Sequence, residues 1–109
     1  MGIFENILKD INEPVSQKDE DYLRSMCDLA GRFANELDCE EVKYRGNIAD
    51  GEVNLYIILL GCIDVIIQTS DKTYLQMCTL ADKVSFINLP DEYDESNSNL
   101  VMVFSKEIA

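Results

Sequence analysis

Four carboxylates crowd a short stretch near the end of this sequence, NLPDEYDESNSN. They belong to Asp91, Glu92, Asp94 and Glu95. Dense carboxylates can hold a divalent cation, and the calcium-binding EF-hand loop requires glycine at its sixth position and glutamate at its twelfth. Counted from Asp91, these positions hold Ser96 and Met102. The spacing therefore argues against a calcium site, and we expect no metal-binding residues here.

Candidates for catalysis are few in the rest of the sequence. The chain has no histidine, which removes the Ser-His-Asp and Cys-His arrangements. Its four cysteines form no C-x-x-C pair, so the usual zinc spacing is missing, and they are typical of free thiols in a reducing compartment. Asp64, which interrupts an apolar run, and a thiol are the only candidates for an enzyme. We expect a non-enzymatic protein with no catalytic residues, metal or cofactor.

The charge of the chain is its most unusual property. Asp and Glu number 21 against 9 Lys and Arg, giving a formal net charge of −12. For a small soluble domain, a net charge with a magnitude of about 2 to 8 is sufficient for solubility. This excess is typical either of a solubilised surface or of a protein attracted to a basic partner. It disfavours direct binding to nucleic acid or to an anionic membrane, since both require a basic patch.

Membrane insertion and export are not indicated by the sequence. The most apolar run, residues 55–63, is far shorter than the roughly 20 residues that a membrane-spanning helix needs. The opening MGIFEN has the glycine of a myristoylation motif but asparagine where serine or threonine belongs. We therefore expect a cytoplasmic protein.

Two helices are predicted at the N-terminal end. Apolar residues recur at helical spacing through residues 1–13, which form a short amphipathic helix that ends near Pro14. A longer helix is expected from Gln17, with Ser16 as its N-cap. Its opposite, solvated face carries Glu20 and Asp28, which we group with the acidic stretch and Tyr93 as candidate partner-binding residues.

From Val42 the apolar period changes to two, which predicts strands. Asp50-Gly51 favours a two-residue hairpin turn, and this loop places Ile48 opposite Val53 on one face of the sheet. Gly61-Cys62 predicts a second turn, which leads into a third strand at residues 63–68. Both faces of the middle strand are then apolar, so a second face must be covered by another helix or by another molecule.

The remaining segments predict a helix from about Ser70, with Tyr74, Leu75 and Cys78 facing inward, and two further strands separated by an acidic loop at residues 91–99. The fold class is therefore α+β. We expect one domain over residues 1–109, with two N-terminal helices and an antiparallel sheet of about five strands in the order α-α-βββ-α-ββ.

This order of elements resembles that of type III secretion chaperones, which share an α-βββ-α-ββ core. The resemblance covers most of the chain and rests on element order alone. The sequence adds a helix before the long one and has no helix at the end, and in that family the final helix contributes to the dimer. The resemblance implies a homodimeric chaperone or adaptor that binds a protein partner through its apolar sheet face.

The sequence therefore leaves two candidate functions. The first is a small acidic inhibitor that imitates nucleic acid and occupies the basic groove of a nuclease or another nucleic-acid-handling protein, as anti-CRISPR and anti-restriction proteins do. Its contact would include the acidic stretch with Tyr93, and Glu20 and Asp28 on the long helix. The second is the homodimeric chaperone or adaptor, which would use the apolar sheet instead of the acids.

Overall fold

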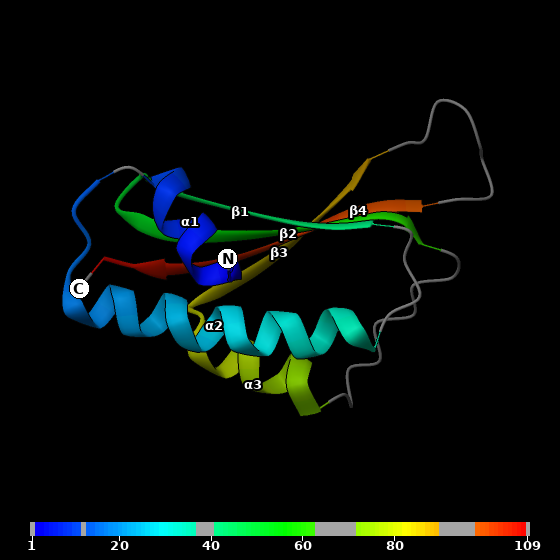
Figure 1. The fold of residues 1–109 in the computed structure, drawn as a ribbon, viewed down its shortest axis with the longest axis horizontal. Coiled ribbons are helices and arrows are strands. Elements are labelled where there is room, and N and C mark those ends of the chain that lie inside the picture. The colour runs from blue at the N-terminus through cyan, green and yellow to red at the C-terminus, as the bar shows by residue number, and fades with distance from the viewer. Residues whose placement is uncertain (1, 12, 37–40, 63–71, 90–97, 109) are drawn as a thin grey trace.

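In the part of the chain that the computed structural model describes, three helices lie on one side of a four-stranded antiparallel sheet, which makes it an α+β domain (Figure 1). The structure describes residues 2–11, 13–36, 41–62, 72–89 and 98–108. The strands lie side by side in the order β1-β2-β4-β3. Within the described residues, no helix is both long enough and apolar enough to cross a membrane.

The helices α1 (Ile3–Ile11) and α2 (Gln17–Asn35) form where the apolar periodicity predicts them. Ser16 is the N-cap of α2, as expected: its Oγ accepts a hydrogen bond from the backbone N–H of Asp19 at 3.2 Å. The same hydroxyl donates to Asp19 Oδ2 at 3.0 Å, which satisfies a carboxylate that is only 2% exposed.

The hairpin of β1 (Glu41–Ala49) and β2 (Glu52–Cys62) has the predicted register, with Ile48 opposite Val53. Its turn residues Asp50 and Gly51 have φ of 54° and 75°, as a type I′ turn requires. This prediction is confirmed because the turn residues and the alternation of apolar side chains specify the same pairing.

The sequence predicts that β2 pairs with β1 on one side and with a strand at residues 63–68 on the other, and the second pairing is wrong. That place belongs to β4 (Ser98–Glu107), which pairs with β2 so that Leu55 lies opposite Phe104. Residues 63–68, the expected third strand, lie outside the described residues, and the described sheet has four strands instead of about five. The pairing with β4 is favoured because it places Met102 and Phe104 beside the apolar side chains of β2 on the face that the helices cover.

The third helix, α3 (Lys72–Leu80), packs mainly on α2 and leads into β3 (Lys83–Leu89) at the edge of the sheet. Its buried residue is Met77, which is fully buried, whereas Leu75 is 46% exposed. The prediction that Leu75 faces inward is therefore wrong. The error follows from the position of α3, which packs mainly on α2.

The hydrophobic core lies between the helices and one face of the sheet. Its strand residues alternate along β2 and β4, and its helix residues come mainly from the apolar stripe of α2. The largest fully buried members are Phe104, Ile7, Leu23, Met26, Leu55, Ile57, Leu59, Met77 and Met102.

Candidate binding surfaces

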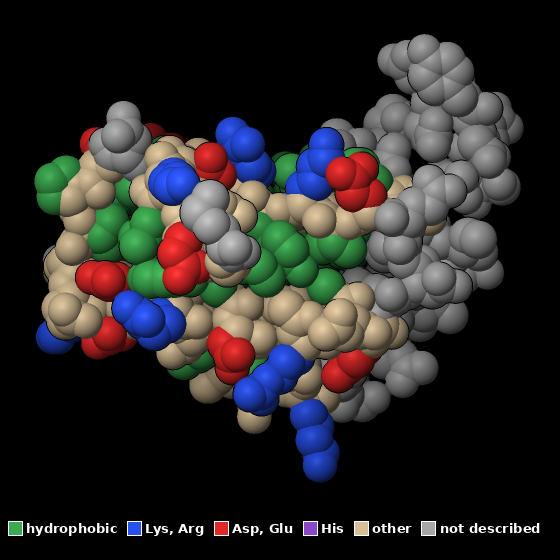
Figure 2. Space-filling model, in the orientation of Figure 1, with side chains coloured by type: hydrophobic (Ala, Val, Ile, Leu, Met, Phe, Trp, Pro, Cys, Tyr) green, Lys and Arg blue, Asp and Glu red, His purple; other side chains and the backbone are tan. Residues whose placement is uncertain are grey.

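The two candidate acids on α2 are ion-paired with arginines one helical turn further along. Glu20 lies 3.5 Å from Arg24, and Asp28 lies 3.2 Å from Arg32. Together the four residues form a stripe of alternating sign, so this face of α2 is close to neutral as a whole. On the face drawn in Figure 2, red and blue side chains are likewise interspersed over the described surface. Glu20 and Asp28 thus do not form an unbroken row of negative charge.

The excess negative charge is distributed very unevenly along the chain. The described residues contain all nine cations and 13 of the 21 acids, and so carry a net charge of −4. The remaining −8 of the total of −12 belongs to residues 37–40, 63–71 and 90–97, which contain eight acids and no Lys or Arg. These three segments are the connections between α2 and β1, between β2 and α3, and between β3 and β4.

The described ends of these three connections meet at one end of the domain, which we call the acidic end (Figure 1). Strand pairing brings together the start of β1 and the end of β2, and likewise the start of β4 and the end of β3, with Glu41 opposite Leu60 and Leu89 opposite Asn99. The first turn of α3 joins them, because Thr73 Oγ1 donates to Glu36 Oε1 at the end of α2, at 3.4 Å. The topology thus anchors every one of the acid-rich connections at the same end.

The acidic stretch itself, Asp91, Glu92, Tyr93, Asp94 and Glu95, lies outside the described residues, as does Asp64. What the structure adds is the position of its two anchors, Leu89 at the end of β3 and Ser98 at the start of β4. Both belong to the acidic end. Glu20 and Asp28 lie along α2, so the structure does not gather all the candidate residues into one patch.

The sheet face opposite the helices carries a second candidate surface. Its apolar side chains lie in the half of the sheet nearer the acidic end, and none belongs to the core cluster between the helices and the sheet. We call this set the open-face patch; it consists of Tyr56, Ile58, Leu60, Ile87, Val101 and Val103. The side chains range from buried Val101 to Ile87, which is 48% exposed. The patch fulfils the expectation that β2 has apolar residues on both faces.

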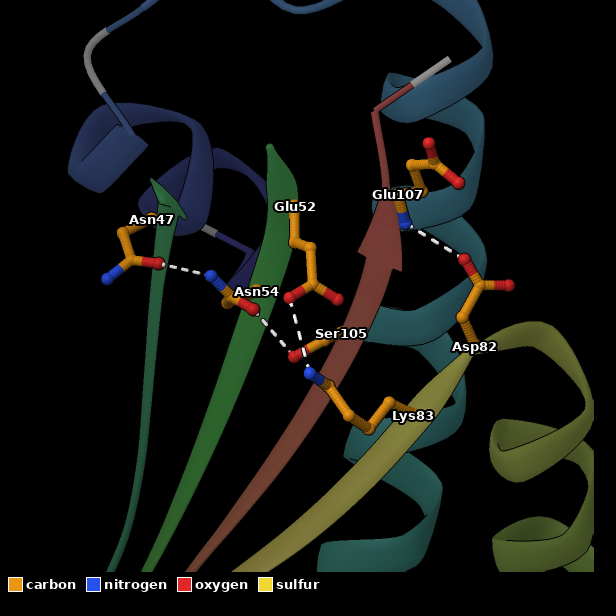
Figure 3. A network of polar contacts seen from close by, with 7 residues as sticks. All are labelled: Asn47, Glu52, Asn54, Asp82, Lys83, Ser105 and Glu107. Atoms are coloured by element: carbon orange, nitrogen blue, oxygen red, sulfur yellow. Dashed lines mark hydrogen bonds and ion pairs between the residues drawn. The ribbon is translucent and has the colours of Figure 1, made fainter. Parts of the chain in front are cut away.

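The other half of the open face is occupied by a polar network that crosses the sheet (Figure 3). Ser105 Oγ donates to Asn54 Oδ1 at 2.6 Å, and Asn54 Nδ2 donates to Asn47 Oδ1 at 2.9 Å. On the edge strand β3, Lys83 forms an ion pair with Glu52 of β2 at 3.3 Å. Sequence reasoning missed this network, although the hairpin register already places Asn47 opposite Asn54. Its hydrogen bonds satisfy the polar atoms that they join and link the side chains of β1, β2 and β4.

Burial favours the neutral forms of two groups with acid–base potential, Cys27 and Tyr44. The buried Cys27 lines a groove of about 570 Å³ between α1 and α2, and burial, together with the nearby charge of Glu5, raises the pKa of its thiol to about 12. Tyr44 lines the same groove, and burial raises the pKa of its hydroxyl as well. Neither group is an activated nucleophile at neutral pH. Among the described residues, no three metal-binding side chains come together.

Two comparisons of the sequence with known proteins were negative. No protein-family model matches the chain, and no curated protein matches it in sequence. The arguments for function therefore rest on the acidic end and on the open-face patch.

Proposed function

We propose that this protein is a non-enzymatic acidic binding protein that occupies a basic site on another protein. Its most specific form is a mimic of nucleic acid that inhibits a nuclease or another nucleic-acid-handling protein, in the manner of anti-CRISPR and anti-restriction proteins. The contact would be made by the acid-rich connections of the acidic end. The protein itself would bind neither nucleic acid nor membrane.

The observation that carries this proposal is the separation of charge. A solubilising surface would spread its acids over the domain, but here the described residues are near balance at −4 and three connections hold −8 without a single cation. Because all three connections are anchored at one end, their carboxylates would create a strong local field. A basic nucleic-acid channel attracts such a field over long range, and the attraction weakens as salt rises.

The proposal is tested with a panel of purified nucleases and nuclease complexes that have basic nucleic-acid channels. Each is incubated with the protein, and binding of a labelled DNA duplex is followed by fluorescence anisotropy at low and at raised salt. We expect at least one member to lose its duplex at low salt and to retain it at raised salt. If the protein displaces no duplex, or displaces it equally well at both salt concentrations, the mimicry proposal fails.

A second candidate function is favoured by the open-face patch. Six apolar side chains on a sheet face without a described helix over it are typical of a protein-binding surface, and would suit a chaperone or adaptor that works as a homodimer. Substituting Ile58 with lysine would place a charge in the middle of the patch. Capture of an apolar client peptide by the parent chain, lost in Ile58→Lys and retained at raised salt, would support this function over mimicry.

A further inference from the structure

Exposed apolar side chains gather on one segment of the domain, α3 and β3. Leu75 and Leu80 on α3 are 46% and 39% exposed, and Phe86 and Ile87 on β3 are 47% and 48% exposed. Of the large apolar side chains that are this exposed among the described residues, only Ile108 lies elsewhere. The Phe86 ring lies beside Tyr74 of α3, with ring centroids 6.5 Å apart, so this exposed side chain of β3 adjoins α3.

The strand β3 is also an edge strand without the usual protection. Natural sheets guard their edges with charges, proline or bulges, because an open edge is a template for another strand. The opposite edge, β1, carries the exposed charges Glu41, Lys43 and Arg45. By contrast, β3 has a single charge, Lys83 at its first residue, and neither an acid nor a proline. Within the described residues, no strand pairs with its outer edge.

The same segment carries no excess of negative charge. Residues 72–89 contain Lys72, Asp82 and Lys83, a net charge of +1, while the rest of the chain carries −13. Two copies of a chain with a net charge of −12 repel each other. A contact along residues 72–89 brings no net negative charge into the interface.

From these observations we propose that a second copy of the chain pairs antiparallel with β3, about a two-fold axis at Phe86. This residue is the centre of the seven-residue strand Lys83–Leu89, so the axis pairs the strand over its whole length, with Lys83 opposite Leu89 of the second copy. The two sheets become one, and both helix layers lie on the same side. The two Phe86 rings then meet at the axis, on the side of the sheet that carries the helices.

Charge favours this arrangement over a random contact. An antiparallel pairing directs the two acidic ends in opposite directions along the sheet, which keeps their carboxylates apart. It also brings Lys83 of each copy to the acidic end of the other. Both open faces come to lie on one side, so their apolar patches adjoin through Ile87. The proposal goes beyond the proposed function, since self-association along β3 does not depend on which partner the acids bind.

The oligomeric state of the full chain tests the proposal. We expect sedimentation equilibrium to show a monomer–dimer equilibrium, and Phe86→Lys to shift it to monomer with an unchanged far-UV circular dichroism spectrum. The matched substitution Ile108→Lys, at the exposed apolar residue outside the segment, should leave the dimer intact. A parent chain that stays monomeric at every concentration would overturn the proposal, as would a dimer that Ile58→Lys splits and Phe86→Lys does not.

Disulfide trapping tests the register directly. Residues opposite each other in an antiparallel pair have Cα atoms about 4.5–5.5 Å apart, within reach of a disulfide. We expect Phe86→Cys to form a covalent dimer on mild oxidation, well above the background that the parent chain sets with its own cysteines. Lys83→Cys should not, because the axis separates the two copies of this residue by about 20 Å. Equal trapping of both variants would overturn the register, even where Phe86→Lys fails to fold.

Discussion

Ile7 of α1 lies directly on Gly46 of β1. A Cβ atom built on Gly46 would come within 2.6 Å of Ile7 Cγ2, closer than real side chains approach. Both residues are buried, and Ile7 is one of the largest fully buried side chains of the core. The missing side chain of Gly46 is therefore what allows α1 to rest on the sheet beside α2.

We predict that Gly46→Ala lowers the free energy of unfolding by about 1–3 kcal/mol, the usual cost of overpacking a core. Gly31→Ala is the matched control, because a Cβ there meets only Ile3 Cδ1 at an ordinary 3.5 Å. In the middle of α2 this alanine should stabilise the protein by about 0.5–1 kcal/mol. Urea denaturation measures both, and a Gly46→Ala variant as stable as Gly31→Ala would contradict the packing of α1.

Tyr22 provides a second test of the core. Its hydroxyl is buried with no hydrogen-bond partner among the described residues, and such a group costs about 1–3 kcal/mol. Tyr22→Phe should therefore raise the free energy of unfolding, by about 1 kcal/mol. Tyr56→Phe is the comparison, because the Tyr56 hydroxyl accepts a hydrogen bond from Asn47 Nδ2 at 3.2 Å. This variant loses that hydrogen bond, so its free energy of unfolding should fall instead. Thermal denaturation that ranks the two variants in the opposite order would be inconsistent with this interpretation.

The pH dependence of stability should report the buried thiol. The pKa of Cys27 is raised from 9.0 to about 12 in the folded protein, so above pH 9 the unfolded chain loses this proton while the folded chain keeps it. The stability is therefore complete below about pH 9 and falls as pH rises toward 12, by about 1.4 kcal/mol per pH unit from this group. Urea denaturation under reducing conditions should show a shallower decline for Cys27→Ala. Identical declines would contradict the burial of the thiol.

The ion pairs on α2 should contribute little to stability. Asp28 and Arg32 are each 66% exposed, and exposed pairs spaced four residues apart on a helix are worth about 0.3–0.5 kcal/mol. Asp28→Asn should therefore destabilise the protein by no more than this amount, and the effect should shrink at high salt. A loss several times larger in chemical denaturation would mean that Asp28 has a structural role beyond this pair.

The local features of the fold could be predicted where one short stretch contains all the determinants. Ser16 as N-cap and the register about Asp50-Gly51 are of this kind, and both are confirmed. The pairing of Leu55 with Phe104 was missed, because the choice between residues 63–68 and β4 as the neighbour of β2 depends on which pairing buries more apolar surface under the helices. Leu75 was misassigned for a related reason: periodicity marks an apolar stripe on α3 but not the element that covers it.

The candidate surfaces could be predicted only in part. The acids of the connections are visible in the sequence, but their common anchoring at one end follows from strand pairing between Glu41 and Leu60 and between Leu89 and Asn99. The ion pairs of Glu20 and Asp28 with arginines were not predicted, although an arginine stands four residues after each acid in the sequence. That Phe86 and Ile87 lie on an edge strand follows from the order of the strands in the sheet, and this order cannot be predicted from periodicity.

The central claim, that the acidic end makes the contact with a basic partner, is tested most directly by comparing two variants of equal charge. One neutralises Asp91, Glu92, Asp94 and Glu95 to their amides. The control neutralises four acids distant from the acidic end, Glu13, Asp21, Asp50 and Glu107. The measurement is the dissociation constant for a nuclease whose duplex the parent displaces, determined across a range of salt concentrations.

We expect the acidic-end variant to bind much more weakly than the parent and with a smaller salt dependence, while the control loses only the modest long-range attraction of four distant charges. Equal losses in the two variants would show that only net charge matters. Unchanged binding by the acidic-end variant would contradict the claim outright.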